Sequence, residues 1–233
     1  MTSSWQNAKS PAPLSAAVIH VWRVSLAADE KQGAGFLAIL SADERKRAAG
    51  FKFEVDRQRF VVAHGVLRLL LAAYLRELPE RLVLVPDSRG KPRLAGPSGD
   101  SIRFNLSHSG EMALCAFAQG LEVGVDIEQI GRDVDELDIA RRMFAPNEVR
   151  QLETMQGDER TTAFFQSWTR LEAVAKASGR GLGGMPLGKG AAKGGSDDGA
   201  VWPIVSLQPG SGYAGAVAAE GTGWKIQCFD WSR

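Results

Sequence analysis

Cysteine and net charge are both scarce in this sequence. Only Cys115 and Cys228 occur in 233 residues, and neither belongs to a Cys-x-x-Cys or Cys/His cluster. This argues against a disulfide framework and a zinc site, so we expect two buried thiols in a reduced, cytoplasmic protein. The 28 basic and 27 acidic residues leave a net charge of +1, which gives no support to a nucleic-acid-binding or membrane-surface protein.

Long hydrophobic runs are also missing. No stretch approaches the roughly 18 apolar residues that a membrane span needs, and Pro11 and Pro13 interrupt the uncharged N-terminal segment. We therefore expect neither a membrane anchor nor a signal peptide. Apolar residues still make up 44% of the chain, and its length allows one large or two small domains with a real core.

Two common catalytic motifs are missing or incomplete. The sequence has no G-x-S-x-G elbow, which argues against a hydrolase of that type. Residues 183–189 match G-x-x-x-x-G-K by letter, but Gly190 stands where a phosphate-binding loop needs Ser or Thr. We expect the glycine-rich segment 183–199 to be a flexible loop, because it has too few apolar residues to pack.

Hydrophobic periodicity indicates several elements in the first half of the chain. We expect residues 1–16 to form a loose arm, and the period-2 alternation over 18–24 predicts a strand. Ser41 and Glu44 form a capping box that begins a short basic helix, whereas the polar, glycine-bearing stretch before it carries no predicted element. Apolar residues at helical spacing predict a long helix over 56–75.

The second half of the chain alternates in a similar way. In order, we predict a strand at 82–85, a turn at 86–92, strands at 104–109, 112–118 and 122–127, helices at 134–155 and 160–177, and strands at 201–207, 213–219 and 225–229. The apolar segments around Gln119 and Gly120 are interpreted as a hairpin. The fold class is therefore α+β, in two lobes that meet near Gly120: residues 1–119 and residues 120–233.

Paired carboxylates are the first candidates for chemistry. On a strand, Asp126 and Glu128 share a face, and two adjacent carboxylates suit a hard cation such as Mg²⁺. The alternative is a strand whose polar face simply contacts water. Glu172 and Lys176 lie one helical turn apart, which fits either a third metal ligand beside a phosphate-binding ammonium or an ordinary surface pair.

Basic and histidine residues give a weaker signal. Scattered arginines and lysines can hold a phosphate-rich ligand, or can form a solvated face: Arg45, Lys46, Arg47, Arg57, Arg59, Lys91 and Arg93. His108 lies between Ser107 and Ser109, but adjacent strand residues point to opposite faces, which disfavours a serine–histidine pair. His20 and His64 are expected to be structural.

Seven motifs in order resemble one family, the two-lobed 4′-phosphopantetheinyl transferases that act on carrier proteins. They span roughly residues 40–182: LSADER at 40–45, DRQRF at 56–60, LR at 67–68, GKP at 90–92, FNLSHS at 104–109, VGVDIE at 123–128, and Trp168 with Glu172, Ala173 and Lys176. Each motif is weak alone, but their common order is specific. The resemblance implies two similar lobes related by a pseudo-twofold, each with a small antiparallel sheet and a long helix.

The resemblance also implies roles for individual residues. Asp126, Glu128 and Glu172 look like Mg²⁺ ligands, and with Lys176, the diphosphate clamp, they form the expected catalytic set. The groups expected to hold the nucleotide of coenzyme A are Arg59, Lys91, Pro92, Ser107 and His108, together with Lys176. The implied reaction attaches phosphopantetheine from coenzyme A to a serine of an acyl or peptidyl carrier protein and releases adenosine 3′,5′-bisphosphate. Phosphoryl-type transfer of this kind depends on positioning and charge neutralisation.

The chain departs from the family pattern at two positions. Leu171 stands where the family most often has Lys, and Gly50 where an Arg is common. These departures motivate an alternative, a non-catalytic coenzyme A or carrier-binding module, and the carboxylates alone would also suit a metal-dependent phosphoesterase. Fatty-acid, polyketide and nonribosomal-peptide carriers all present a similar serine, so the sequence does not choose among them. A monomer suffices, because both lobes lie in one chain.

Overall fold

The computed structural model describes residues 4–96, 101–131, 134–184 and 201–232. The helices are α1 (Glu30–Ile39), α2 (Ala42–Ala49), α3 (Glu54–Leu75), α4 (Glu136–Met143), α5 (Pro146–Thr154) and α6 (Gly157–Ser178), with 3₁₀ turns at Pro79–Arg81 and Leu182–Gly184. The strands are β1 (Trp5–Ala8), β2 (Val18–Ser25), β3 (Leu84–Pro86), β4 (Pro92–Leu94), β5 (Ile102–Ser109), β6 (Met112–Gln119), β7 (Val123–Gln129), β8 (Ile204–Leu207), β9 (Tyr213–Ala219) and β10 (Lys225–Trp231).

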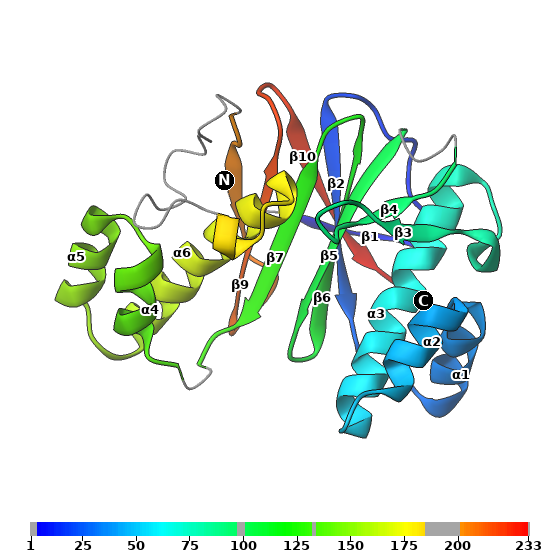
Figure 1. Ribbon diagram of the computed structural model, residues 1–233, viewed down its shortest axis with the longest axis horizontal. Helices are drawn as coiled ribbons and strands as arrows, with labels where there is room; N and C mark the ends of the chain where they lie inside the picture. The colour runs from blue at the N-terminus through cyan, green and yellow to red at the C-terminus, as the bar shows by residue number, and fades with distance from the viewer. Residues whose placement is uncertain (1–3, 97–100, 132–133, 185–200, 233) are drawn as a thin grey trace.

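Two sheets lie between two groups of helices, which gives a two-lobed α+β fold (Figure 1). The first sheet has the order β1-β10-β2-β6-β5, and the second has the order β7-β9-β8. β3 and β4 form a separate two-stranded hairpin. The second sheet is antiparallel, as expected, but the first is mixed, because β1, β10 and β2 run parallel to one another.

The long helix of the first lobe is its core element. α3 has 22 residues, and its apolar side packs with Trp22 and Phe117 of the first sheet in one buried cluster. α1 covers α3 so closely that a Cβ on Gly65 would lie 2.5 Å from the ring of Phe36. By length and composition α3 could cross a membrane, yet 61% of its most apolar window is buried inside the protein, as in an ordinary core helix.

The long helix of the second lobe lies directly on its sheet. α6 also has 22 residues and packs on β7 and β9. A Cβ on Gly124 would lie 2.2 Å from the carbonyl oxygen of Ala173 and 2.3 Å from the amide nitrogen of Ala177. Only glycine permits this approach, which brings α6 beside the strand that carries Asp126. The helix ends at Gly179, whose φ of +68° suits glycine.

Most elements predicted from periodicity are confirmed. The strands at 18–24, 104–109 and 112–118 and the long helices at 56–75 and 160–177 are all present within a few residues of the expected bounds. The capping box of Ser41 and Glu44 begins α2, as predicted. The region 134–155 is helical but forms two helices, because the chain extends at Phe144 and Ala145 before Pro146 begins α5.

Three predictions near the N-terminus and the centre of the chain are wrong. The arm is not wholly loose, because β1 pairs in parallel with β10, and the indole of Trp5 donates to the backbone oxygen of Gln208. The polar stretch contains α1, which begins with a capping box of Asp29 and Gln32. The segments around Gln119 do not form a hairpin: β6 pairs with β5 and β2, whereas β7 pairs with β9.

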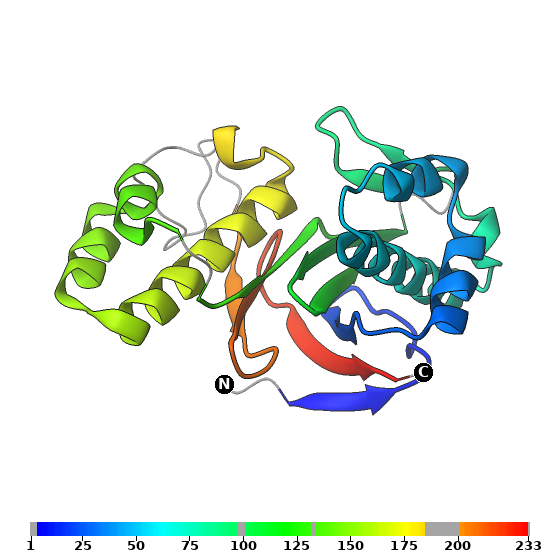
Figure 2. The ribbon, with the colours of Figure 1, turned by 90° about the horizontal axis from the view of Figure 1, so that it is seen from below.

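The lobe boundary also needs a correction. The chain crosses from the first sheet to the second near Gly120, as expected, but β10 returns to the first sheet and lies between β1 and β2. Figure 2 shows β1 and β10 side by side along the edge away from the helices. The lobes are therefore not consecutive halves of the chain. The expected loop at 183–199 falls, from residue 185 onward, outside the described residues.

Candidate active site

The two sheets meet along β5 and β7, and side chains join them there. Asn105 and Ser107 lie on the same side of β5, two residues apart. The side-chain oxygen of Asn105 accepts a hydrogen bond from the amide of Val125 at 2.9 Å, and the hydroxyl of Ser107 donates to Oδ1 of Asp126 at 2.8 Å. A polar row on one strand thus holds the carboxylate of the other strand at the junction between the lobes.

Ser109 extends this row to the second carboxylate. Its hydroxyl donates to Oε2 of Glu128 at 2.7 Å and accepts from the amide of Gln129 at 3.0 Å. Asn105 and Ser109 were not among the site residues predicted from the sequence. The alternation of Asn105, Ser107 and Ser109 along β5 was the available signal, since residues two apart on a strand share a face.

Replacement of Ser109 by alanine (Ser109→Ala) is expected to destabilise the protein by about 1–3 kcal/mol, because the amide of Gln129 loses its acceptor in a partly buried seam. The free energy of unfolding, measured by urea titration, tests this. Ser206→Ala is the matched control, since Ser206 is an exposed residue in a strand of the second lobe. Equal stabilities of the two variants would contradict the role of Ser109.

Lys176 completes the arrangement around Asp126. Its ammonium donates to Oδ1 of Asp126 at 2.6 Å and to the hydroxyl oxygen of Ser107 at 3.0 Å. Asp126 is 2% exposed, and its other oxygen, Oδ2, is buried without a hydrogen-bond partner. Burial raises the pKa of Asp126, although Lys176 and Ser107 oppose this. The Oδ2 of Asp126 is therefore a buried oxygen without a hydrogen-bond partner, and a cationic ligand would stabilise it.

Glu172 lies one turn before Lys176 on α6 and shares a cavity with it. This cavity, of about 240 Å³, is also lined by Arg89, Pro92 and Asn105. Burial raises the pKa of Glu172; the charge of Lys176 lowers it, and that of Asp126 raises it further. Glu172 therefore lies within electrostatic reach of both members of the Asp126–Lys176 pair.

The three predicted metal ligands do not converge on one point. Among residues 4–96, 101–131, 134–184 and 201–232, no group of three or more His, Cys, Asp or Glu side chains is arranged to hold a metal ion. The charge of Asp126 raises the pKa of Glu172, whereas the carboxylate of Glu128 accepts a hydrogen bond from Ser109. Carboxylate oxygens are nevertheless the ligands of Mg²⁺, which commonly takes only one or two of them together with substrate phosphates. The buried Oδ2 of Asp126 therefore fits such an ion.

A larger cavity of about 620 Å³ continues from this point into the first lobe. It shares Gly90, Pro92, Asn105 and Leu106 with the smaller cavity, and its walls include Phe51, Phe60, His64 and His108. These walls combine flat apolar rings with polar groups, as a nucleotide site requires.

His108 lines this cavity, whose walls also carry Asp43, Glu44 and Arg47. Removal of water from its ring lowers the pKa of His108, and the neighbouring charges of His64, Lys176 and Arg59 lower it further, whereas Asp56 raises it. Arg59 projects from α3, with its guanidinium 3.7 Å from the carboxylate of Asp56. Arg59 and Lys176 therefore both act on His108 as neighbouring charges, although Lys176 lines only the smaller cavity and His108 only the larger one.

Lys91 lines the smaller cavity together with Lys176, but its ammonium is bonded to protein groups. Its side chain is 6% exposed, and its ammonium donates to Oε2 of Glu122 and to the backbone oxygens of Val123 and Ala177, at 3.1, 2.9 and 3.1 Å. An ammonium has three hydrogens to donate, so no donor remains for a phosphate. Pro92 does line both cavities.

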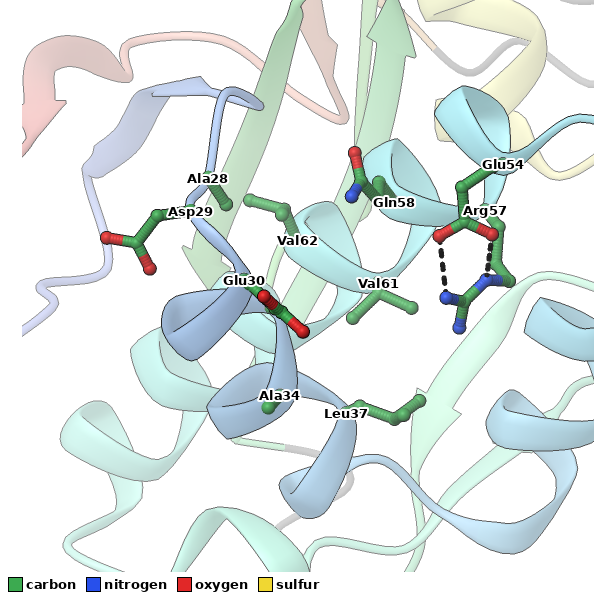
Figure 3. A pocket seen from close by; sticks show the side chains of 11 residues that line it. Ala28, Asp29, Glu30, Ala34, Leu37, Glu54, Arg57, Gln58, Val61 and Val62 are labelled. Carbon is green, nitrogen blue, oxygen red and sulfur yellow. Dashed lines mark hydrogen bonds and ion pairs between the residues drawn. The ribbon is translucent and has the colours of Figure 1, made fainter.

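A separate cavity of about 470 Å³ lies between α1 and α3 (Figure 3). Its floor is formed by Val61, Val62 and Leu37, and the exposed pair of Glu54 and Arg57 borders it. Of the candidate residues named from the sequence only Arg57 lines it, and the guanidinium of Arg57 is paired with Glu54. We therefore place the candidate site at the junction of β5, β7 and α6, where Asp126 pairs with Lys176.

Comparisons with known proteins give the family to which the chain is similar. The model of the 4′-phosphopantetheinyl transferase superfamily matches residues 122–191, and that of the 4′-phosphopantetheinyl transferase N-terminal family matches residues 27–119. The chain is 35% identical over 214 residues to the 4′-phosphopantetheinyl transferase HetI of Nostoc sp., covering 89% of this chain and 90% of HetI. It is 27% identical over 158 residues to Sfp of Bacillus subtilis, covering 68% of each protein, and 35% identical over 140 residues to AcpT of Salmonella typhimurium, covering 60% of each.

Proposed function

Since the chain belongs to the 4′-phosphopantetheinyl transferase superfamily and is a transferase of that class, we propose that it transfers 4′-phosphopantetheine from coenzyme A to a serine of an acyl or peptidyl carrier protein with the help of Mg²⁺. The observation that carries this proposal is the buried Asp126, with one oxygen on Lys176 and the other unsatisfied, beside a cavity large enough for a nucleotide. Adenosine 3′,5′-bisphosphate is the second product.

Asp126 and Glu172 are the residues that would hold the metal, with Glu128 as a further candidate ligand. When bound, Mg²⁺ neutralises the diphosphate and stabilises the leaving group. Asp126 suits this task because its Oδ2 is buried without a partner. Ser107 keeps the carboxylate of Asp126 fixed through its hydrogen bond of 2.8 Å.

The cations around the two cavities are proposed to bind the phosphates. Lys176 exchanges part of its contact with Asp126 for a diphosphate oxygen, while Arg59 and His108 hold the remaining phosphate oxygens. Ser107 has a single hydroxyl hydrogen and keeps it on Asp126, so its part is to fix that carboxylate beside the phosphates. Charge-assisted hydrogen bonds of this kind are short and strong. The rings of Phe51 and Phe60 line the same cavity as the imidazole of His64, which suits a flat adenine base.

The transfer step itself needs one proton acceptor from this chain. The serine hydroxyl of the carrier attacks the phosphorus that bears pantetheine, and the bond from that phosphorus to the adenosine bisphosphate oxygen breaks. Glu172 takes the serine proton, directly or through a water, and the departing oxygen keeps the electron pair of the broken bond. The nucleophile arrives on the partner protein, so this chain supplies positioning and charge.

We further propose that each lobe has its own task. The first lobe, residues 1–119, binds the nucleotide phosphates through Arg59 and His108. The second lobe, residues 120–233 without the returning strand β10, carries the metal ligands and receives the carrier. A monomer in the cytoplasm is sufficient for this scheme, because both lobes belong to one chain.

A mass-shift assay tests the proposal directly. Apo carrier proteins of the fatty-acid, polyketide and nonribosomal-peptide types are incubated with the protein, coenzyme A and Mg²⁺, and are then weighed by mass spectrometry. We expect one phosphopantetheine to be added, with formation of adenosine 3′,5′-bisphosphate, and loss of the reaction in a metal chelator. Binding of coenzyme A without transfer would favour a binding module, and phosphate release without a carrier would favour a phosphoesterase.

Removal of the Arg59 guanidinium (Arg59→Ala) is expected to raise the KM for coenzyme A by about 10-fold or more, because a charged hydrogen bond to phosphate is lost. Steady-state kinetics with coenzyme A and with 3′-dephospho-coenzyme A measure this. The preference for coenzyme A over its dephospho form should shrink in the variant. An unchanged preference would contradict a role of Arg59 at the nucleotide phosphate.

A further inference from the structure

The β3–β4 hairpin of the first lobe is fastened to the end of α6 in the second. We propose that Lys91, in this hairpin, is a positioning residue that holds α6 against β7, and not a ligand of the nucleotide phosphates. This inference rests on the proposed function, because it concerns the placement of Glu172 and Lys176 for transfer. Figure 2 shows the hairpin of the first lobe extending toward the C-terminal end of α6.

The contacts of Lys91 join three segments at one atom. Its Nζ donates to the carboxylate of Glu122 and to the backbone oxygens of Val123 and Ala177. Val123 is the first residue of β7, and Ala177 lies in the last turn of α6. A buried ammonium therefore links the hairpin, the start of the metal-binding strand and the end of the helix that carries Glu172.

The position of these contacts explains why a cation is needed. The last carbonyl groups of a helix lack partners within the helix and carry partial negative charge. Lys91 satisfies the carbonyl of Ala177, and Arg89, on the same hairpin, donates to the carbonyl of Ser178 at 2.7 Å. Both bonds cross from one lobe to the other, so the hairpin caps α6 from outside.

Glu122 makes the anchor rigid. Its carboxylate accepts from Lys91 at 3.1 Å, from Arg93 at 2.5 Å and from Arg103 at 3.0 Å. Arg93 also binds Asp87 at 3.2 Å, which fixes the turn of the hairpin. Lys91 is thus part of a network of charges that is complete without a bound ligand.

The anchored residues lie next to the catalytic pair. Ala177 follows Lys176 directly, and Gly124, next to Val123, is the point at which α6 contacts β7 most closely. Asp126 lies two residues further along the same strand. Loss of the Lys91 ammonium should therefore let the end of α6 shift relative to β7, and this changes the distance between Lys176 and Asp126.

The test is the substitution Lys91→Met, which keeps the length of the side chain and removes its charge. We expect kcat for carrier modification to fall by about 10-fold or more, since a misplacement of about 1 Å can cost about 100-fold. The Kd for adenosine 3′,5′-bisphosphate, measured by calorimetry, should change by less than about twofold, whereas loss of a phosphate ligand would raise it by about 10-fold or more. Hydrogen exchange should become faster at the amides of residues 173–178.

Two further variants keep the test decisive. Glu122→Gln weakens the same anchor, and an acidic residue such as Glu122 is not a phosphate ligand. If Lys91→Met does not fold, Glu122→Gln serves in its place, and we expect it to lower kcat while the Kd stays constant. Lys31→Met, on the exposed side of α1, is the control and should leave all three readouts unchanged.

The outcomes separate the inference from the proposed function. A raised Kd in Lys91→Met, or a lower melting temperature with unchanged kcat, would overturn the positioning role. A wild-type protein that neither binds adenosine 3′,5′-bisphosphate nor modifies any carrier would overturn the proposed function instead, while faster exchange at 173–178 in Lys91→Met would still support the anchor.

Discussion

Glutamine in place of Glu172 (Glu172→Gln) is expected to slow carrier modification by about 10²- to 10⁴-fold, the usual contribution of a positioned general base. The amide keeps the size of the side chain but cannot take the serine proton. Binding of coenzyme A should be largely spared, because the phosphate-binding groups Arg59, His108 and Lys176 remain in place. The rate is measured from initial velocities of holo-carrier formation, and the affinity by calorimetry.

The matched control for this experiment lies on the same helix. Glu159 is an exposed glutamate in the first turn of α6, far along the chain from the candidate site. Glu159→Gln is expected to leave the rate within about twofold of the wild type, as a solvated surface substitution should. Near-normal turnover of the Glu172→Gln variant would show that Glu172 is not the proton acceptor, whatever effect the substitution has on metal affinity.

The second large effect concerns folding and does not depend on the proposed reaction. Arg68→Met is expected to lower the free energy of unfolding by about 3–5 kcal/mol, because it leaves a buried carboxylate without its main cation. Arg68 is 1% exposed; it donates to Oε2 of Glu44 at 2.6 Å and to the backbone oxygens of Pro79 and Leu82. Urea unfolding at pH 7, followed by circular dichroism, measures the loss.

An exposed ion pair in the same lobe provides the control. Arg57 and Glu54 are also 2.6 Å apart, but their side chains are 37% and 61% exposed, at the border of the cavity in Figure 3. Arg57→Met should therefore cost less than about 1 kcal/mol. Similar losses for the two arginine variants would show that burial does not set the strength of the Arg68–Glu44 pair.

The Arg68–Glu44 pair also predicts how stability depends on pH. Burial opposes ionisation of Glu44, but hydrogen bonds from His64 and the Ser41 amide, together with Arg68, hold the pKa of Glu44 at about 2 in place of its ordinary 4.5. The folded protein thus binds this proton less readily than the unfolded chain. The corresponding stabilisation, about 3 kcal/mol, is present above pH 4.5 and disappears as the pH falls from 4.5 toward 2. Acid titration of Arg68→Met should show a smaller loss over this interval.

Much of the local structure could be predicted from the sequence, because it depends on neighbours along the chain. The capping box of Ser41 and Glu44 is an interaction across three residues, and the long helices follow from apolar residues at helical spacing. The shared face of Asp126 and Glu128 follows from the period of a strand. Glycine at 179 ends α6, as its φ of +68° requires.

Only the tertiary structure could decide which distant segments meet. β1 and β10 pair in parallel across more than 200 residues of sequence, and β6 and β7 belong to different sheets although they are neighbours in the chain. The hydrophobic periodicity of a strand does not indicate which other strand it pairs with. The same holds for Lys91: a lysine in a turn has the residue type of a phosphate ligand. Its ammonium instead donates to Glu122 and to the backbone oxygens of Val123 and Ala177, because the fold brings these distant groups together around it.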